Sequence, residues 1–253
     1  MFHIFSSLKN ETKNIYGLIG KELKHSFSPT YFQKKFEKEG ITNSHYQLFP
    51  LTNIEEFIAL IKNHKNLKGL NVTIPYKQAI IPYLDEIDAA AKEINAVNTI
   101  QFKDGKLIGY NTDVLGFEKS ISPLLKKKHK KALIFGTGGA SKAVIFVLKK
   151  MNIPFKLISR SKTKLSYSDI DEKRLKKYKI LINTTPLGMF PKVEDYPVID
   201  YKGISKKHLA YDLVYNPLET TFLKKAAAQG AKTKNGLEML EIQAEEAWKI
   251  WNS

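Results

Sequence analysis

Short apolar segments alternate with segments of helical periodicity along most of this chain, and that alternation restricts the fold more than any other feature of the sequence. Residues 15–20, 45–49 and 67–74 are rich in β-branched and aromatic side chains and are bounded by Gly, Pro or polar residues, as strands are. Residues 29–40 and 54–64 lie between them and place apolar side chains at i, i+3 and i+4, which predicts amphipathic helices. This β-α-β-α-β order predicts an α/β fold with a mostly parallel sheet.

A predicted hairpin separates this series from a second one. Residues 96–113 hold two alternating segments on either side of Asp104-Gly105, and Asp-Gly is a strong signal for a β-hairpin. The elements predicted after it are a strand and a helix within 131–150, strands at 154–160, 179–186 and 208–215, a helix at 217–229, a short strand at 231–235 and an amphipathic helix after Gly236. Two such series predict two domains, and the basic run 126–131 is one candidate boundary.

The composition excludes several classes of protein. The chain has 253 residues and no cysteine, which excludes a disulfide scaffold and a thiolate metal site and suits a reducing cytoplasm. No group of His, Asp and Glu has the spacing of metal ligands, so no metal site is predicted. The N-terminal segment lacks a basic leader followed by an apolar stretch, and no later stretch approaches about 18 uncharged apolar residues. Neither a signal peptide nor a membrane span is predicted.

The net charge of +16 could indicate a nucleic-acid partner. The excess is almost entirely lysine, however, and Arg160 and Arg174 are the only arginines. Nucleic-acid readers rely on arginine for bidentate contacts and stacking, so a general lysine bias is the better explanation. The densest run, LLKKKHKK at 124–131, is typical of a solvated linker. No specific nucleic-acid partner is predicted.

Residues 133–141, LIFGTGGAS, predict a strand that runs through a glycine-rich turn into a helix. Gly136 permits a tight bend, and Gly138 lets the backbone approach a pyrophosphate at the helix N-terminus. Ser141 replaces the third glycine of the usual G-x-G-x-x-G, so the loop alone indicates either a nucleotide site or a plain tight turn. The residues that would hold the nucleotide are Gly136, Thr137, Gly138, Gly139 and Ala140.

The segment after the next predicted strand, SRSKTK at 159–164, favours NADP(H) over NAD. NAD sites usually place an acidic residue about 20 residues after the glycine loop, where it holds the ribose 2′-hydroxyl, and this segment contains no acid. Arg160 can stack on adenine and donate to a 2′-phosphate. The candidate cofactor residues here are Ser159, Arg160, Ser161 and Lys164.

Eight segments together resemble the shikimate dehydrogenase family in order and spacing, from about residue 14 onward. They are YGLIGKELKHSFSPTYF, GLNVTIPYKQ, AVNTI, GYNTDVLGF, GTGGAS, INTTPLGM, YDLVYNPLETTFL and GLEMLEIQA. The resemblance implies two α/β domains around a cleft: a substrate-binding catalytic domain of residues 1–113 plus 236–253, and a Rossmann-type NADP-binding domain of residues 114–235. The family often has Asn-Arg-Thr where this chain has Ser159-Arg160-Ser161, a departure that bears on affinity.

The resemblance implies that Lys77 and Asp113 form the catalytic pair. Reduction of a ketone needs a proton donor near the developing alkoxide, and a lysine with a nearby carboxylate can serve. The structural alternatives are a solvated lysine that opens a helix and an aspartate that caps one. His25 also lies in a matching segment, but the family does not use that position for catalysis.

The resemblance also implies a set of binding residues. Ser26 and Ser28 match serines that hold the substrate carboxylate, although Ser28 could instead cap a helix ahead of Pro29. The positions matching polar or aromatic residues around the substrate are Asn71, Thr73, Asn98, Tyr215 and Gln243. The positions matching cofactor contacts are Thr184, Leu213 and Gly236, and for the last two a purely structural role is equally expected.

The expected activity is the reversible, NADPH-dependent reduction of 3-dehydroshikimate to shikimate in a cytoplasmic monomer or homodimer. One alternative is a quinate/shikimate dehydrogenase with broader substrates or NAD use. Another is a catalytically silent binding protein on the same fold, which would usually have lost one of the two catalytic residues.

Overall fold

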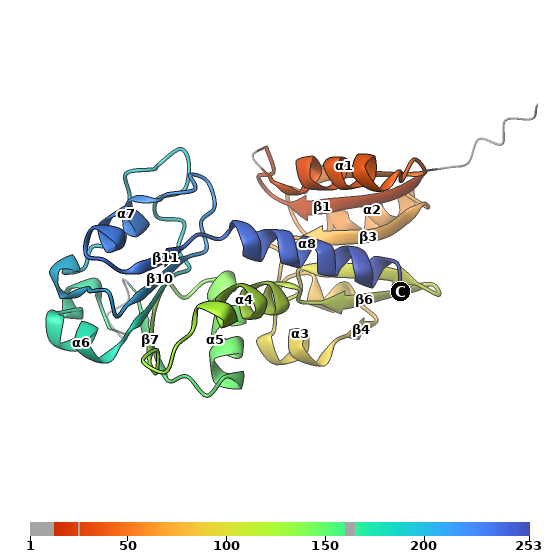
Figure 1. Ribbon diagram of the computed structural model, residues 1–253. Helices are drawn as coiled ribbons and strands as arrows, with labels where there is room; N and C mark the ends of the chain where they lie inside the picture. Colours follow the sequence, from red (N-terminus) through yellow and green to blue (C-terminus); the bar gives the residue numbers. More distant parts are fainter. Residues whose placement is uncertain (1–12, 25, 160–164) are drawn as a thin grey trace, which may run out of the picture. The chain divides into compact units, whose positions relative to one another are not determined.

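The computed structural model describes residues 13–24, 26–159 and 165–253 (Figure 1). The contacts within the described chain divide it into two compact units. The first unit holds the described residues up to Asp88, with Val97–Tyr110 and Ile250–Ser253; the second holds Ala89–Ala96 and Asn111–Lys249. This division places most of the C-terminal helix with the second unit, whereas the predicted ligand-binding domains assign it to the first.

The first unit contains a six-stranded sheet of order β2-β1-β3-β5-β6-β4. The strands are β1 (Asn14–Gly20), β2 (Ser44–Pro50), β3 (Leu67–Val72), β4 (Glu86–Ile87), β5 (Thr99–Lys103) and β6 (Lys106–Tyr110). Strand β1 pairs in parallel with β2 and β3, while β5 runs antiparallel to both of its neighbours. The three strands predicted first form a parallel set, the predicted hairpin is antiparallel, and the short strand β4 pairs in parallel with β6.

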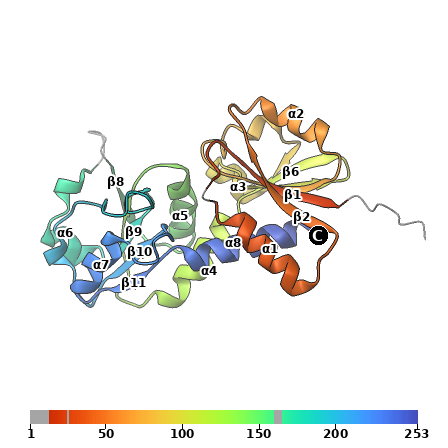
Figure 2. The same cartoon turned by 90° about the horizontal axis from the view of Figure 1, so that it is seen from above.

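The helices α1 (Ser28–Glu39) and α2 (Glu56–Asn63) lie on opposite faces of this sheet (Figure 2). The chain steps from β1 to β2 in one direction and from β2 across β1 to β3 in the other, so right-handed crossovers put the two helices on opposite sides. Helix α1 starts with a proline in its first turn and ends at Gly40, which has a left-handed φ of 66°. Both predicted helices are confirmed within a few residues.

The turn between β5 and β6 follows directly from its two residues. Asp104 has φ 50° and Gly105 has φ 75°, and positive φ at both central positions is the requirement of a type I′ turn. Lys103 pairs with Lys106 across it. The predicted hairpin is confirmed.

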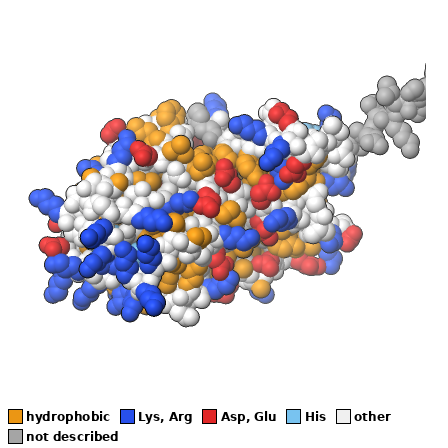
Figure 3. Space-filling view, in the orientation of Figure 1, with side chains coloured by type: hydrophobic (Ala, Val, Ile, Leu, Met, Phe, Trp, Pro, Cys, Tyr) orange, Lys and Arg blue, Asp and Glu red, His pale blue; other side chains and the backbone are white. Residues whose placement is uncertain are grey.

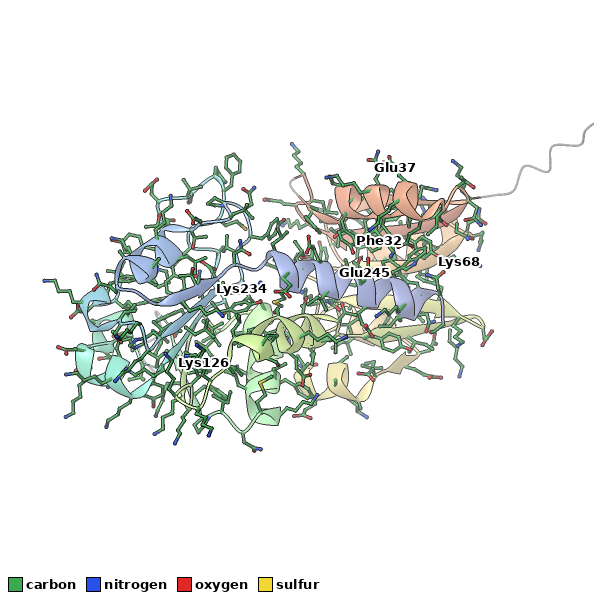
Figure 4. All side chains as sticks on the ribbon, viewed as in Figure 1. Phe32, Glu37, Lys68, Lys126, Lys234 and Glu245 are labelled. Carbon is green, nitrogen blue, oxygen red and sulfur yellow. The ribbon has the colours of Figure 1, made fainter. Side chains whose placement is uncertain are left out.

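An aromatic cluster around Trp251 fills one side of the core of the first unit. The Trp251 ring lies 5.1 Å from the ring of Tyr16 and 5.4 Å from that of Phe32, and its Nε1 donates to the Ile100 carbonyl at 3.0 Å. A Cβ added at Gly69 would lie 2.2 Å from the indole, so β3 needs glycine there. Phe32 and Glu37 point to opposite sides of α1, which explains the periodicity of that helix (Figure 4).

The second unit contains a five-stranded, fully parallel sheet of order β11-β10-β9-β7-β8. Its strands are β7 (Ala132–Phe135), β8 (Phe155–Ile158), β9 (Ile180–Asn183), β10 (Leu209–Asp212) and β11 (Lys232–Lys234). The chain goes from β7 outward to β8 and then crosses back to β9, so the direction of winding reverses between β7 and β9. Ligands of open α/β sheets bind at such a switch point, beyond the carboxyl ends of the strands.

Alternate residues of these strands pack into two apolar cores. Ile134, Ile182 and Tyr211 belong to one core, and Leu133, Leu181 and Ala210 belong to the other. The helices of this unit are α3 (Ala89–Ile94), α4 (Asp113–Ile121), α5 (Gly139–Lys150), α6 (Glu172–Lys177), α7 (Thr221–Ala228) and α8 (Leu237–Trp251), of which α8 reaches the first unit with its last two residues. The α/β class and the Rossmann-type second sheet are confirmed.

Lysines gather on the surface of the second unit near α6 (Figure 3). Lys128 Nζ donates to the Lys206 carbonyl at 2.9 Å. Burial, followed by the charges of Lys207 and Lys128, lowers the pKa of Lys179. The run 126–131 forms a loop, as predicted for a linker, but it lies within the second unit.

Candidate active site

Lys77 lies in a turn that follows β3. The backbone N–H of Val97 donates to the Lys77 carbonyl at 2.7 Å, and the neighbouring Tyr76 hydroxyl donates to the Leu51 carbonyl at 2.7 Å. Residues 74–80 are all turn residues, so Lys77 does not open a helix. Lys77 is half-buried, and its backbone is held in an irregular segment rather than in a helix.

The two asparagines predicted to read the substrate are joined in one buried network. Asn71 Oδ1 accepts from the Tyr46 hydroxyl at 2.8 Å, and Asn71 Nδ2 donates to Thr99 Oγ1 at 3.3 Å. Thr99 Oγ1 in turn donates to Asn98 Oδ1 at 3.0 Å. Tyr46 and Thr99 were not predicted, because their hydrogen bonds to Asn71 join residues 25 and 28 positions apart in sequence.

Ser28 extends this network. Its side chain hydrogen-bonds Tyr46, whose pKa is nevertheless raised by burial. Ser28 is the first residue of α1 and Phe27 occupies the N-cap position, so the capping alternative for Ser28 does not hold.

Ser26 is half-buried, and its N–H donates to the Leu23 carbonyl at 3.0 Å. Thr73 is also half-buried, and its N–H donates to the Ile19 carbonyl.

Tyr46→Phe is expected to raise the KM for the predicted substrate about 5- to 20-fold and to leave the KM for the predicted cofactor within about twofold. The variant removes one hydrogen bond from Asn71 and one from Ser28, at a cost of about 1–2 kcal/mol. Steady-state kinetics with each substrate varied in turn would measure the two constants. Tyr83→Phe, a half-buried tyrosine of the same unit, is the matched control. Equal changes in both constants would contradict a role in holding substrate.

Asp113 is the first residue of α4, and Thr112 precedes it at the N-cap position. Thr112 Oγ1 donates to Gln243 Oε1 at 3.4 Å, which brings the predicted Gln243 to the same helix start. A Cβ at Gly116 would lie 2.6 Å from the Met239 carbonyl oxygen, so α4 and α8 pack closely here. Asp113 lies in the first turn of α4, where a carboxylate interacts favourably with the helix dipole, but it is not the N-cap residue. Lys77 lies in the first unit and Asp113 in the second, and their pairing stays a prediction.

The glycine loop after β7 has the shape that the sequence predicts. Gly136 has φ 106°, and a Cβ there would lie 2.8 Å from Thr184 Oγ1. At Gly138 and Gly139, by contrast, an added Cβ would meet no described atom within 4 Å. Helix α5 begins at Gly139, and its N-cap residue has no side chain to occupy the free N–H groups. The loop thus presents open backbone at a helix N-terminus, which fits a pyrophosphate.

The rest of the loop supports this arrangement. Thr137 is exposed and Ala140 is half-buried. Ser141, at the position of the third glycine, is buried and its Oγ donates to the Gly138 carbonyl at 2.6 Å. The serine therefore closes the turn with a hydrogen bond.

Thr184, directly after β9, lies against this loop. Thr184 donates to the Phe135 carbonyl through both its N–H at 2.9 Å and its Oγ1 at 2.8 Å, which ties the end of β9 to the end of β7. Ser159 is buried after β8, and its N–H donates to the Leu165 carbonyl. Arg160, Ser161, Lys164 and His25 lie outside the described residues.

Leu213 and Gly236 contact each other beyond the end of β10. A Cβ at Gly236 would lie 2.1 Å from the Leu213 carbonyl oxygen, and the Gly236 N–H donates to the Val214 carbonyl at 3.1 Å. Close packing of two backbones therefore requires glycine here. The half-buried Tyr215 follows in the same loop.

A buried carboxylate at the end of β10 was not predicted from the sequence. Asp212 is fully buried and accepts from Val214 N–H at 3.0 Å, Asn183 Nδ2 at 2.9 Å and Thr220 Oγ1 at 2.6 Å. Burial raises the pKa of Asp212 to about 6, and the three hydrogen bonds act in the opposite direction. No local pattern marks it, because its partners Asn183 and Thr220 lie 29 and 8 positions away in sequence.

Among the residues that the structure describes, no group of three or more His, Cys, Asp or Glu could hold a metal ion. Within the same residues, no helix combines the length and apolar character needed to cross a membrane.

The likeness to known proteins covers nearly the whole chain. Residues 18–100 match the family model of the shikimate dehydrogenase substrate binding domain. A shikimate dehydrogenase (NADP+) from Methanosphaera stadtmanae is 43% identical, over 94% of this chain and 90% of that protein. The chain belongs to the shikimate dehydrogenase family.

Solved structures of the family have the same fold. The crystal structure of shikimate dehydrogenase from Aquifex aeolicus is 41% identical, with a TM-score of 0.84 over 95% of this chain and 92% of that one. A shikimate dehydrogenase crystallised in complex with NADP+ is 38% identical, also with a TM-score of 0.84, over 96% of this chain and 91% of that one. The likeness therefore includes both units of the fold.

Proposed function

We propose that this chain catalyses the reversible, NADPH-dependent reduction of 3-dehydroshikimate to shikimate. The observation that carries the proposal is the 43% identity to a shikimate dehydrogenase (NADP+) over almost the full length of both chains. The presence of both Lys77 and Asp113 supports an active enzyme over a silent binding protein on the same fold. A cytoplasmic monomer or homodimer is part of this proposal.

Lys77 would give its proton to the substrate oxygen as the carbonyl carbon is reduced, and would take it back in the reverse reaction. NADPH, when bound, supplies the hydride. Asp113 would orient the ammonium group of Lys77 toward the substrate oxygen. The position of Lys77 in a turn lets its side chain extend from an irregular backbone.

The buried network of the first unit would recognise the substrate. Ser26 and Ser28 offer two hydroxyl donors one residue apart for a carboxylate. Asn71 and Asn98 are already oriented by Tyr46 and Thr99, which lowers the entropic cost of binding a polyol. Thr73, Tyr215 and Gln243 would add further polar contacts. A pocket built on buried amides rejects analogues that leave those amides unpaired.

The second unit would hold NADP(H) at its switch point. The open backbone at Gly138 and Gly139 fits the pyrophosphate, and the segment that contains Arg160 carries no acid to repel a 2′-phosphate. Thr184, Leu213 and Gly236 lie at the carboxyl ends of β9 and β10 or in the loop that packs on them. The position of each of these three residues supports a contact with the cofactor.

Oxidation of shikimate and of quinate, each with NADP+ and with NAD+, tests the proposed function. We expect kcat/KM for shikimate with NADP+ to exceed the other three values by at least about tenfold, which corresponds to 1.4 kcal/mol. Efficient oxidation of quinate with NAD+ would favour the broader dehydrogenase. Binding of shikimate without turnover by any cofactor would favour the silent protein and overturn the proposal.

A further inference from the structure

The fully buried Asp212 joins two loops that leave the sheet of the second unit. Its Oδ1 accepts from the Val214 N–H at 3.0 Å and from Asn183 Nδ2 at 2.9 Å. Its Oδ2 accepts from Thr220 Oγ1 at 2.6 Å. These donors come from the loop after β10, the end of β9 and the start of α7, so one carboxylate connects three separate segments.

The Asn183 branch fixes the loop after β9. Asn183 Oδ1 accepts from the Thr185 N–H at 3.1 Å and from Thr185 Oγ1 at 2.6 Å. Asn183 Nδ2 also donates to the Leu187 carbonyl at 3.3 Å, and Thr185 Oγ1 accepts from the Leu187 N–H. Thr184 lies inside this bonded loop, so its position against Phe135 and the glycine turn depends on the orientation of the Asn183 amide.

The Val214 branch fixes the loop after β10. Val214 N–H is held by Asp212, while the Val214 carbonyl accepts from the Gly236 N–H at 3.1 Å. Leu213 lies between Asp212 and Val214 in the chain, and its own N–H donates to the Asn183 carbonyl at 2.9 Å. Since Gly236 packs directly on the Leu213 carbonyl, a shift of Val214 would move both residues.

A carboxylate is an expensive choice for such a site. Its three described donors are all neutral groups, and burial of an ionised group without a full counter-charge costs stability. If the position were only structural, a neutral side chain that hydrogen-bonds locally would serve at lower cost. A charged acceptor makes shorter and stronger hydrogen bonds, which is useful where loop geometry must be held closely.

We propose that Asp212 is a positioning residue for the cofactor: it holds the loops after β9 and β10 in one arrangement, so that Thr184, Leu213 and Gly236 can bind NADP(H). This inference rests on the proposed function. Asp212 belongs to the second unit and is fully buried there. Its loss should therefore weaken cofactor binding selectively.

The test compares Asp212→Ala and Asp212→Asn with the wild-type enzyme in steady-state kinetics and in direct titration of NADP+. Asp212→Ala is expected to raise the KM and the Kd for NADP+ at least tenfold and the KM for shikimate less than twofold. Asp212→Asn keeps an oxygen for Val214 and Asn183 but loses the charge and the acceptor for Thr220, so it is expected to recover only part of the lost affinity.

Tyr211→Phe is the matched control. Tyr211 is the preceding residue of β10, is equally buried, and loses one hydrogen bond of 2.6 Å to Ser120 on the other face of the sheet. It should lower stability without changing either KM. If Asp212→Ala does not fold, Thr220→Val removes one donor to the carboxylate and should raise the KM for NADP+ at least threefold.

Unchanged affinity for NADP+ in Asp212→Ala, or in Thr220→Val where the first variant does not fold, would overturn the inference while leaving the proposed function intact. Equal increases in the KM for NADP+ and for shikimate would also overturn it, because they would indicate general destabilisation. A wild-type protein that neither binds NADP+ nor oxidises shikimate would overturn both proposals.

Discussion

Replacement of Lys77 by Met is expected to lower kcat for shikimate oxidation about 100- to 10,000-fold, which is the usual contribution of a general acid or base. Methionine keeps most of the aliphatic volume and removes only the ammonium group, so the backbone contact with Val97 should persist. The KM or Kd for shikimate should change little. The absorbance of NADPH followed at saturating substrate measures the rate, and shikimate titration measures binding.

Lys68→Met supplies the control for this experiment. Lys68 lies nine positions earlier, on β3, and its side chain is exposed (Figure 4). The same chemical change there should leave kcat within about twofold, as exposed surface substitutions away from a site usually do. A Lys77 variant with wild-type turnover would rule out the proposed proton donor, whatever its effect on binding.

Trp251→Ala is expected to lower the free energy of unfolding by about 3–5 kcal/mol, the usual cost of truncating a large buried aromatic side chain. The indole is 6% exposed, packs on Tyr16 and Phe32, and donates to the Ile100 carbonyl. The cavity would open beside Gly69, which has no side chain to fill it. Chemical denaturation followed by circular dichroism measures the change.

Two further variants separate packing from hydrogen bonding. Trp251→Phe keeps a ring but loses the Nε1 donor to Ile100, so its cost should lie well below that of the alanine variant. Lys249→Ala removes an exposed side chain two residues earlier on the same helix and should change stability by less than about 0.5 kcal/mol. Equal stability of Trp251→Ala and Lys249→Ala would show that the helix end does not anchor the first unit.

The elements with local signals were predicted well from the sequence. Gly40 ends α1 through its left-handed backbone, and Asp104 with Gly105 fixes a hairpin, because each residue acts on its own segment of chain. The β7–α5 turn was predicted for the same reason, because Gly136 has a positive φ and a close neighbour in Thr184. Such features require no knowledge of which strands become neighbours.

The residues that orient the site were missed because their roles arise only when strands pair. Tyr46 is 25 residues from Asn71, and Asp212 is 29 residues from Asn183. Neither distance has a periodic meaning in sequence. Lys77 is a different case: its chemistry is shared with 38 other lysines, and only the surrounding N-V-T-x-P-x-K segment distinguishes it. Family resemblance identified the residue, and local geometry explains how it is held.

The place of Trp251 in the chain affects the order in which the protein can mature on the ribosome. Domains generally fold as units during synthesis, with the N-terminal one first. Here the core of the first unit includes an indole that follows Leu237–Lys249, the last segment of the second unit. The second unit has therefore been synthesised in full before the first one receives its final aromatic side chain. The half of the protein that is begun first is completed last.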